Sequence, residues 1–350
     1  MNPIYTGTWG NCHIQGIAVD DEKGFIYYSF TTKLIKSTLD GKIIGSVDGL
    51  VGHLGCIDFN KADGRVYGSL EFKNDSVGRG ILKNIGSDVS FEDAFYLAVF
   101  DVDKIDRLDM DAERDGVMTA VYLREVVDDF NGTGFDKHGK EVPHRFGCSG
   151  IDGTAIGPVP GGDRSKNYIF IAYGIYGDTS RDDNDCQIIL RYDIEKLKEY
   201  ETPVNQRSMH RNGPASPESK YFVYTGNTTY GVQNLEYDAF TDSYIMAVYR
   251  GKKKDFPNFE LFMIDALTAP ETKKIPGVGI EGEMLTLRQC GEYDSITGVY
   301  GRHPELGTTG FYARGDGSYL ISHNMNTAEG QCGYIYSYSY SEKDGFIKEE

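Results

Sequence analysis

Cysteine is scarce in this sequence, and the few Cys residues show no pairing pattern. Six of 350 residues are Cys, and no two of them form a CxxC motif. Isolated Cys residues in a chain of this size are typical of buried, reduced thiols and not of a disulfide framework. The six are Cys12, Cys56, Cys148, Cys186, Cys290 and Cys332.

Basic residues are also fewer than acidic ones. The chain has 36 Lys and Arg against 53 Asp and Glu, which gives a formal net charge of −17. Both a nucleic-acid phosphate backbone and an anionic membrane would be repelled, so neither is expected as a partner. An acidic small substrate is still compatible with this charge, because a local basic site can lie on an acidic surface.

Several familiar signals are absent from the sequence. The segment Met1-Asn2-Pro3-Ile4-Tyr5 has neither a basic start nor an apolar run, and no stretch approaches the length of a membrane span. We therefore expect a cytoplasmic protein, with secretion as the alternative if a leader has been removed. The sequence also has no P-loop, no dinucleotide fingerprint and no nucleophile elbow.

The most informative feature that is present is a repeat. Residues 4–28 and 223–249 share the order strand, loop, strand, Asp turn, strand, with related phrases at each step. A repeated all-β unit cannot bury its apolar face alone, so the copies must pack on one another. The 25 Tyr and 43 Gly also fit many short strands and tight turns.

Five such units can be found. Each begins with a Gly-rich polar phrase that runs into an apolar stretch, as expected for a strand crowded near a central axis. Three of the third strands end in related Asp-containing phrases, which makes a chance similarity improbable. The innermost strands are expected at 13–17, 53–58, 149–153, 232–235 and 308–312. Second strands are expected at 24–31, 65–72, 168–173, 244–249 and 319–323, and third strands at 96–101, 188–193, 261–265 and 334–340.

This organisation resembles β-propeller proteins over essentially the whole chain. The resemblance implies an all-β, five-bladed β-propeller forming a single domain over residues 1–350. Residues 4–7 align with an outer strand at 221–225, so they are expected to complete the last blade and close the ring. No WD dipeptide or kelch diglycine pattern identifies a narrower family. Five-bladed propellers include sugar-acting enzymes, nucleotidases and lectins, which is an analogy of fold alone.

The units are longer than blades need to be. Five units give about 70 residues each, whereas a blade usually needs ~40–50. Insertions are expected near 73–93 and 107–116, both in the second unit, and near 131–146 and 199–219. Six or seven blades would require these insertions to hide further strands. Residues 117–127 are interpreted as the outer strand of the second unit.

The propeller resemblance predicts where a site should lie. Loops that enter the innermost strands and loops that leave the second strands open on the same face, so their polar side chains should converge at the axis. The strand starts contribute His13, Gln15, His53, Asp152, Gln233, Asn234 and Thr309. The strand ends add Thr32, Glu71, Tyr173, Arg250 and His323, with Asn324 just beyond.

These residues allow three kinds of chemistry. His13, His53 and His323 with Gln233 would suit a divalent transition metal, while Asp152 and axial carbonyls would suit calcium. Without a metal, His53 or His13 could act as a base while Tyr173 or Arg250 stabilises the developing charge. Glycoside hydrolysis would need two carboxylates, for which Glu71 and Asp152 are the candidates. Tyr173, Tyr176 and Tyr230 could serve as aromatic platforms for sugar rings.

Two charged segments have simpler interpretations beside their functional ones. The basic run at 250–254 should project from the face of the site and attract a carboxylate, sulfate or phosphate, or it is a solvated turn. The acidic run at 109–116 departs from the EF-hand pattern, because its Gly comes late and the closing Glu is missing. We interpret it as a solvated insertion.

The sequence thus favours a carbohydrate-active enzyme, a glycoside hydrolase or a polysaccharide or sugar-acid lyase, with one axial site. The catalytic candidates are His13, His53, Glu71, Asp152 and His323. The substrate, a small molecule or an oligosaccharide, would contact Gln15, Tyr173, Gln233, Asn234, Arg250 and Asn324. The alternative is a non-catalytic, lectin-like or protein-binding propeller. A lectin should repeat one pocket in every blade, and here the equivalent residues differ from unit to unit.

Overall fold

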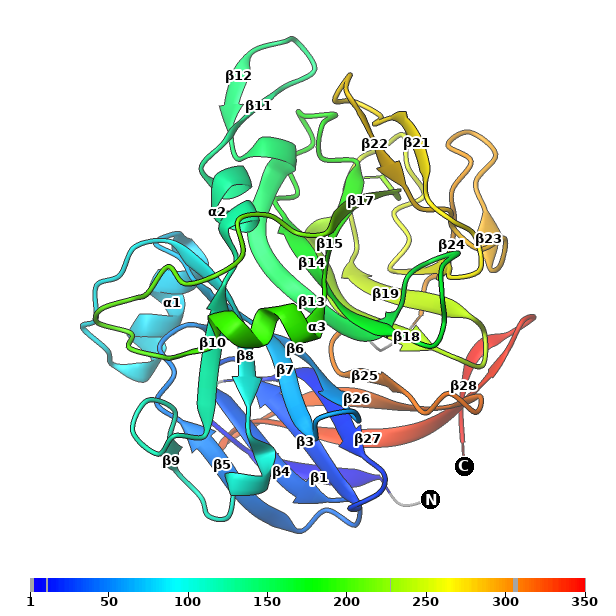
Figure 1. The fold of residues 1–350 in the computed structure, drawn as a ribbon. Coiled ribbons are helices and arrows are strands. Elements are labelled where there is room, and N and C mark those ends of the chain that lie inside the picture. The colour runs from blue at the N-terminus through cyan, green and yellow to red at the C-terminus, as the bar shows by residue number, and fades with distance from the viewer. Residues whose placement is uncertain (1–2, 11, 227, 305–307, 350) are drawn as a thin grey trace.

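Five β-sheets stand around a common axis in a computed structural model, which describes residues 3–10, 12–226, 228–304 and 308–349. Figure 1 shows the sheets following one another in chain order from blue to red. The chain forms a five-bladed β-propeller, as the repeat predicted. None of the helices in the described part of the chain is long and apolar enough to cross a membrane.

The first two blades are built from the N-terminal part of the chain, with the innermost strand first in each. Both are antiparallel apart from one short parallel edge strand, β9. Blade 1 contains β2 (Ile14–Asp20), β3 (Phe25–Phe30), β4 (Lys33–Thr38), β5 (Ile43–Asp48) and β9 (Met110–Asp111). Blade 2 contains β6 (His53–Asn60), β7 (Arg65–Phe72), β8 (Ala94–Phe100), β10 (Met118–Tyr122) and β16 (Thr202–Pro203).

Blades 3 and 4 follow the same inner-to-outer order. Blade 3 contains β13 (Cys148–Pro158), β14 (Asn167–Ile175), β15 (Cys186–Tyr192), β17 (Ser219–Tyr224), β22 (Glu281–Met284) and β21 (Glu271–Lys274). Blade 4 contains β18 (Thr229–Asp238), β19 (Ser243–Tyr249) and β20 (Leu261–Asp265), and the hairpin β23 (Glu292–Tyr293) with β24 (Tyr300–Gly301) lies beyond it.

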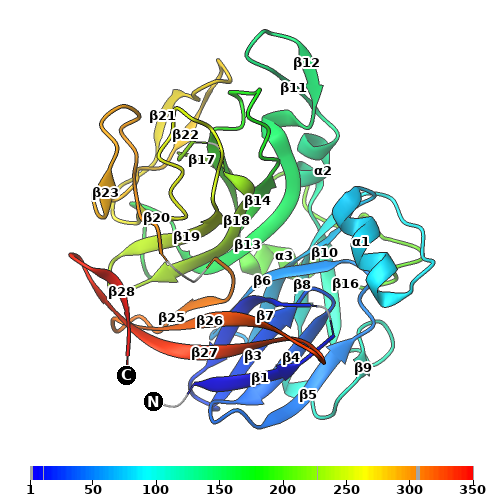
Figure 2. The ribbon, with the colours of Figure 1, turned by 180° about the vertical axis from the view of Figure 1, so that it is seen from behind.

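Blade 5 joins the two ends of the chain. Its strands are β25 (Phe311–Ala313), β26 (Ser318–Thr327) and β27 (Gly330–Ser341), and β28 (Gly345–Lys348) also pairs with β27. The N-terminal strand β1 (Ile4–Thr8) pairs antiparallel with β27. Figure 2 shows this dark blue strand lying along the red one. The expected closure of the ring by residues 4–7 is therefore confirmed.

The core consists of five apolar clusters, each shared by two neighbouring blades. Alternate residues of one strand face different clusters, so that Tyr27 packs with blade 2 while Ile26 and Tyr28 pack with blade 5. Because inner and middle strands are covered on both faces, they read as nearly continuous apolar runs. The cluster between blades 5 and 1 joins Ile14 and Ile17 to Leu320 and Ile335, which completes the ring.

The insertions contain more structure than the sequence predicted. Residues 73–93 hold helix α1 (Ser76–Ile85), and residues 131–146 hold the hairpin β11 (Thr133–Phe135) and β12 (Glu141–Pro143). The interpretation of 117–127 as one strand was wrong beyond Tyr122, because α2 (Arg124–Phe130) begins there. Three short 3₁₀ turns and α3 complete the structure: η1 (Val102–Lys104), η2 (Arg145–Gly147), α3 (Ile194–Leu197) and η3 (Lys198–Tyr200).

Residues 107–116 were expected to enlarge blade 2, yet part of them belongs to blade 1. Strand β9 pairs in parallel with β5, the outer strand of blade 1. Asp111 accepts hydrogen bonds from the backbone N–H groups of Glu113 and Arg114 at 3.0 Å, so it shapes a turn. The physical reason for the different placement is the unpaired edge of β5, which the insertion covers.

Candidate functional site

The starts of the inner strands and the ends of the second strands meet at one mouth of the axis, as predicted. A cavity of about 380 Å³ lies there, and α1 forms one of its walls. In Figure 2 α1 lies on the side of the ring that faces the viewer. Among the described residues that line the cavity, the polar groups include His13, Gln15, His53, Glu71, Lys73, Asp152 and Gln233.

Strand register places His53 and Glu71 together. At the closed end of the hairpin Asn60 pairs with Arg65, but at the cavity His53 pairs with Glu71, one residue out of step with a regular ladder. A bulge between Leu54 and Ile57 causes this shift. Bulges re-aim side chains in this way. Register shifts also occur between the inner and second strands of the other blades, one in blade 1 and two each in blades 3 and 4.

Glu71 is buried in a set of fixed contacts. Its Oε1 lies 2.6 Å from Lys73 Nζ, and its Oε2 accepts a hydrogen bond of 3.0 Å from the backbone N–H of Ile151. Burial alone would raise the pKa of Glu71, but the charges of Lys73 and His53 outweigh it and lower the pKa. Glu71 is therefore a carboxylate at neutral pH.

Asp152 lies in the same cavity, and its pKa is shifted in the opposite direction, upward. It is 8% exposed, and its Oδ1 has no hydrogen-bond partner among the described residues. Burial, reinforced by the negative charge of Glu71, raises the pKa of Asp152 to about 7. Two carboxyl groups with divergent pKa values in one cavity are a frequent arrangement in acid–base catalysis.

His53 is a neighbour of both carboxyl groups. Its Nδ1 is 3.6 Å from Glu71 Oε1, which is an ion-pair distance too long for a hydrogen bond. Burial would lower the pKa of His53, but the charges of Asp152 and Glu71 raise it overall. Asp152 therefore gains or loses a proton near neutral pH, while these two carboxyl groups favour the charged form of His53.

His13 differs from His53 in its protonation. Its Nε2 lies 3.1 Å from Gln15 Nε2, and Gln15 is itself buried at the cavity wall. Burial and the neighbouring His53 lower the pKa of His13, so it is neutral at pH 7. A neutral imidazole beside an amide can accept or donate a hydrogen bond to a polar ligand.

Two glycines allow the carboxyl groups to lie against the backbone. A Cβ atom at Gly55 would lie 2.0 Å from Asp152 Oδ1, and one at Gly150 would lie 2.1 Å from Glu71 Oε2. Gly150 also has a φ of +119°, a conformation that favours glycine. Both acids therefore need glycine on the adjacent inner strand.

Helix α1 supplies the apolar wall. Asp75 caps it by accepting a hydrogen bond of 2.9 Å from the Gly78 N–H, and Gly86 ends it with a left-handed φ of 66°. Val77, Ile81 and Ile85, which recur every four residues and share one helix face, line the cavity. A hydrogen bond of 2.9 Å from Tyr176 Oη to Asp75 Oδ2 anchors the helix to blade 3.

Tyr230 and Tyr249 provide aromatic surface at the cavity. Their rings lie 5.9 Å apart, edge to face. Tyr230 is half exposed and has a positive φ of 64°, which is unfavourable for a bulky side chain and marks a backbone held by its surroundings. Burial and the charge of Asp152 raise the pKa of Tyr249 to about 12, so it is a hydroxyl donor at neutral pH.

Several predicted site residues lie elsewhere. Tyr173 is fully buried between blades 2 and 3 and donates a hydrogen bond of 2.8 Å to Asp129. His323 is not among the described residues that line the cavity, and its ring packs 4.2 Å from that of Tyr336. Asn234 and Asn324 bond to the backbone of neighbouring inner strands, at Gln15 O and Phe311 N for Asn234 and at Ile14 N for Asn324.

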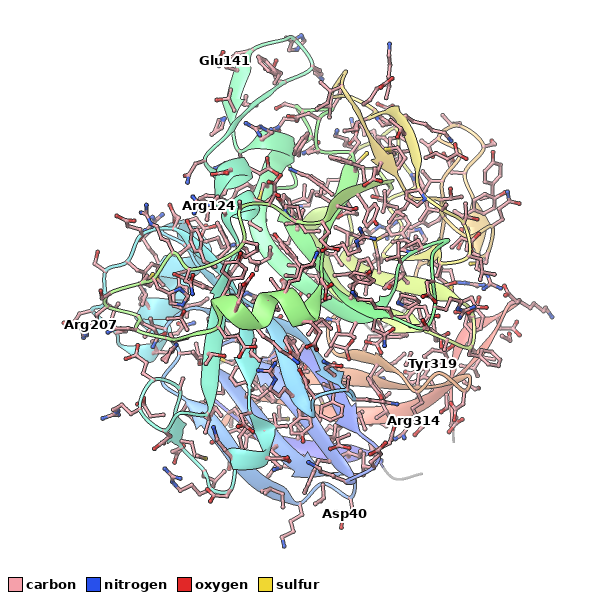
Figure 3. All side chains as sticks on the ribbon, in the orientation of Figure 1. Asp40, Arg124, Glu141, Arg207, Arg314 and Tyr319 are labelled. Carbon is pink, nitrogen blue, oxygen red and sulfur yellow. The ribbon has the colours of Figure 1, made fainter. Side chains whose placement is uncertain are left out.

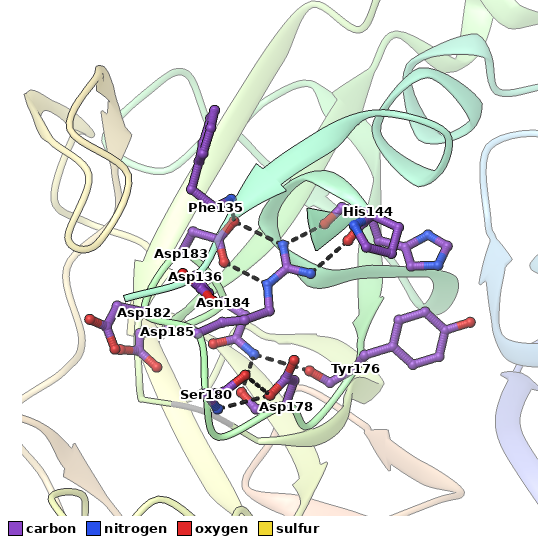
Figure 4. Close-up of polar contacts among 12 residues, drawn as sticks. Phe135, Asp136, His144, Tyr176, Asp178, Ser180, Asp182, Asp183, Asn184 and Asp185 are labelled. Atoms are coloured by element: carbon purple, nitrogen blue, oxygen red, sulfur yellow. Dashed lines mark hydrogen bonds and ion pairs between the residues drawn. The ribbon is translucent and has the colours of Figure 1, made fainter. Parts of the chain in front are cut away.

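The basic run at 250–254 does not form the expected anion clamp at the cavity. Arg250 is exposed and is not among the described lining residues. Lys253 is buried, where it donates to the Arg181 carbonyl and contacts Asp185 at 2.6 Å. The neighbouring Arg181 guanidinium bonds to Asp183 and to the carbonyls of Pro143 and His144 (Figure 4). These cations are neutralised within the acidic loop 178–185.

The structure also adds residues that the sequence analysis missed, namely Lys73, Tyr249 and the face of α1. Lys73 follows the predicted second strand directly, and a helix was indicated by the capping pair Asp75 and Gly86 around apolar residues spaced by four. As for a metal, no group of three or more His, Cys, Asp and Glu side chains that could hold one occurs in the described residues. His323, the third predicted imidazole ligand, points to Tyr338 Oη at 2.7 Å.

No protein-family model matches the sequence, and no curated protein matches it either. Solved structures similar in overall shape include a family 43 β-1,3-galactosidase, with 12% identity, a TM-score of 0.42 and coverage of 99% of this chain and 97% of that one. A luciferin-regenerating enzyme matches at 11% identity, a TM-score of 0.39 and coverage of 96% and 95%. The Neurospora crassa Pan2 WD40 domain matches at 9% identity and a TM-score of 0.30, with coverage of 92% of this chain and 74% of that one. These levels of similarity do not indicate a particular chemistry.

Proposed function

We propose that this protein is a carbohydrate-active enzyme that uses acid–base chemistry in the axial cavity. One observation supports this most directly: Asp152 lines an open cavity beside His53 and Glu71, and its buried Oδ1 has no hydrogen-bond partner among the described residues. A buried polar atom without a partner costs free energy, so it persists where a ligand or a reaction uses it. Perturbed carboxyl groups in a cleft are candidates for catalysis.

In the proposed mechanism Asp152 and His53 form the proton-transfer pair. Asp152, protonated near neutral pH, donates its proton to the leaving oxygen of a glycosidic bond, and His53 returns a proton to it. Glu71 stays ionised because Lys73 and the Ile151 N–H hold it, and it keeps His53 charged. Hydrolysis and β-elimination share this proton donation. They differ in the proton that His53, neutral after returning its own to Asp152, then accepts: from the attacking water in hydrolysis, or from the C–H bond that breaks in β-elimination.

The rest of the cavity suits a small polyhydroxylated molecule. Its volume of about 380 Å³ fits a ligand of one or two sugar rings. Gln15, Gln233 and His13 offer hydrogen bonds to hydroxyl groups, while Tyr230 and Tyr249 can stack on a ring face. The apolar side of α1 would cover the C–H face of the substrate.

A substrate screen tests this proposal. The protein is incubated with neutral and uronate-containing oligosaccharides, and new reducing ends and the absorbance of unsaturated products are both followed. Asp152→Asn should lower the activity found by about 10²–10⁴-fold, the range typical of a lost general acid. Asp163→Asn is the matched control, because Asp163 is exposed and bonds only Ser165 among the described residues.

The outcome separates catalysis from binding. Saccharide binding without turnover, unchanged in Asp152→Asn, would favour the lectin-like alternative. Turnover that survives both Asp152→Asn and His53→Gln would contradict the assignment of these residues.

A further inference from the structure

The opposite end of the axis holds a second cavity, of about 630 Å³. It lies where the inner strands of blades 2 to 5 end, next to α3, which faces the viewer in Figure 1. It shares none of its described lining residues with the axial cavity. Between the two, Cys56 Sγ packs 3.4 Å from the Thr154 carbonyl, and a Cβ at Gly16 would lie 2.6 Å from Ile57 N. The two cavities are therefore separate sites.

Two buried carboxyl groups from different blades line this cavity. Asp58 is 7% exposed and accepts backbone hydrogen bonds from Phe59 at 2.7 Å and Ile156 at 2.6 Å. Glu236 is 4% exposed, and its Oε1 accepts a bond of 3.0 Å from the Ala313 N–H. Its Oε2 is buried and has no partner among the described residues. Glu236 thus lines the cavity with one carboxylate oxygen that no described residue uses.

The protonation of the pair agrees with this geometry. Burial raises the pKa of Asp58 to about 7, against the lowering effect of its two backbone bonds and of Lys61. Burial, together with the charges of Asp58 and Asp238, raises the pKa of Glu236 well above its usual range. A positive charge placed between the two would lower both pKa values and release protons.

The wall of the cavity is partly aromatic, and most of the cations at its rim are paired. Phe59, Tyr237 and Tyr312 line it. Lys166 contacts Asp193 at 2.7 Å, and Arg314, labelled in Figure 3, contacts Asp21 at 2.7 Å. Lys61 is exposed at the rim, where it has no ion pair among the described residues. The interior therefore remains acidic and aromatic, and this combination is suited to an organic cation.

We propose that this cavity binds a small organic cation through a primary ammonium group placed between Asp58 and Glu236. An ammonium has three donors, which match Glu236 Oε2 and the remaining lone pairs of the two carboxylates. A calcium ion would want six to eight oxygen ligands, and two carboxyl groups supply few of them. The volume also exceeds what a bare ion requires, and the aromatic side chains would contact the carbon atoms of the ligand.

Isothermal titration calorimetry with the full chain tests this proposal. The probe is 1,4-diaminobutane, and 1,4-butanediol is its neutral control of the same length. We expect the diamine to bind at pH 7 with release of protons, measured from the difference between phosphate and MOPS buffers, and the diol not to bind. Glu236→Gln, which keeps an oxygen for the Ala313 N–H, should weaken diamine binding at least tenfold.

Two variants localise the effect. Glu195→Gln at the rim of the same cavity and Asp152→Asn in the axial cavity should both leave diamine affinity unchanged. Binding of CaCl₂ that depends on Glu236, with no response to the diamine, would overturn the proposal in favour of a metal site. Equal binding of diamine and diol would also overturn it. So would the absence of diamine binding up to about 10 mM, because even weak sites have dissociation constants on the order of millimolar. The diamine–diol comparison uses the unaltered protein, so it remains decisive if Glu236→Gln does not fold.

Discussion

At the scale of single residues, the axial cavity makes three titratable groups behave differently although they are close neighbours. Lys73 and the Ile151 N–H hold Glu71 as an anion, while Asp152 has no ion pair, and its Oδ1 no hydrogen bond, with any described residue. The negative charges of Asp152 and Glu71 raise the pKa of His53 and so favour its charged form. The environment of each group, and not its residue type, sets its role in the proposed chemistry.

This division predicts the pH dependence of activity. Because the pKa of Asp152 is raised to about 7, its acid form predominates below that pH and is lost above it. We expect kcat/KM to fall about tenfold per pH unit on the alkaline side of ~7, as one essential acid titrates. Profiles between pH 5 and 9 on the substrate found in the screen would show this limb. A flat profile, or one that rises with pH, would contradict the role of Asp152 as acid.

The residues of this site were predictable from the sequence in part. His53, Glu71 and Asp152 followed from the expected strand order, because starts and ends of strands converge in a propeller. The pairing of His53 with Glu71 did not follow, since it depends on a bulge that no residue pattern specifies. Tyr173 was misplaced for the same reason: a one-residue shift sends a side chain to the opposite face of the sheet. The basic run at 250–254 does not indicate from sequence that Lys253 is buried against Asp185, because that contact depends on how a distant loop packs.

At the scale of elements, segments of one blade cover the outer edge of the blade before it. The connection between β8 and β10 of blade 2 supplies β9 to blade 1, and the connection between β15 and β17 of blade 3 supplies β16 to blade 2. Strands β21 and β22, which follow blade 4, pair onto β17 of blade 3. These insertions protect exposed strand edges and tie neighbouring blades together. Chain order predicted the blades but not these crossings, because very short edge strands have little signal.

Helix α1 allows a test of how one element shapes the site. Asp75→Ala removes the helix cap, the bond from Tyr176 and a neighbour of Lys73 at 3.8 Å. We expect a loss of about 1–2 kcal/mol in the free energy of unfolding, as for other lost N-caps, and a higher KM because the wall of the cavity loosens. Urea denaturation and steady-state kinetics measure the two effects.

The matched control for that variant is Asp75→Asn. Asparagine caps helices about as well as aspartate, so it should keep most of the stability and the low KM. If Asp75→Asn were as damaging as Asp75→Ala, charge and not capping would be the main contribution of Asp75.

At the scale of the whole molecule, closure of the ring joins distant parts of the chain through buried hydrogen bonds as well as strand pairing. Thr6 is fully buried, and its Oγ1 donates to the Gly333 carbonyl at 3.1 Å and accepts from the Gly333 N–H at 3.0 Å. Thr6→Val keeps the shape but leaves both backbone groups of Gly333 without this partner. We expect a loss of about 1–3 kcal/mol, the cost of an unsatisfied buried polar group. Thr8→Val, where the hydroxyl meets an exposed Tyr5, should change the free energy of unfolding little.

The buried carboxyl groups together predict how the stability of the molecule varies with pH. The pKa is raised to about 7 for Asp58 and Asp152, to about 6 for Asp185, and in the same direction for Glu236. At these four positions the folded state binds more protons than the unfolded state between pH 4 and 7, so they make the free energy of unfolding fall as pH rises. His13, His210 and His323, whose pKa is lowered by burial, act in the opposite direction. Each pKa unit is worth roughly 1.4 kcal/mol at most. Glu71, whose pKa is lowered, acts in the opposite direction, and its contribution is lost as pH falls below about 5.

Urea denaturation at pH 5, 6, 7 and 8 measures this slope. The net charge of −17 adds repulsion of the same sign, so the series is repeated in 0.5 M NaCl, which screens surface charges but not buried ones. We expect the decline to persist in salt and to become shallower in Glu236→Gln, which cannot ionise at that position. A decline that disappears in salt would assign the effect to the surface. Stability that rises between pH 5 and 8 would show that Asp58, Asp152 and Glu236 are ionised at little cost, against the burial described above.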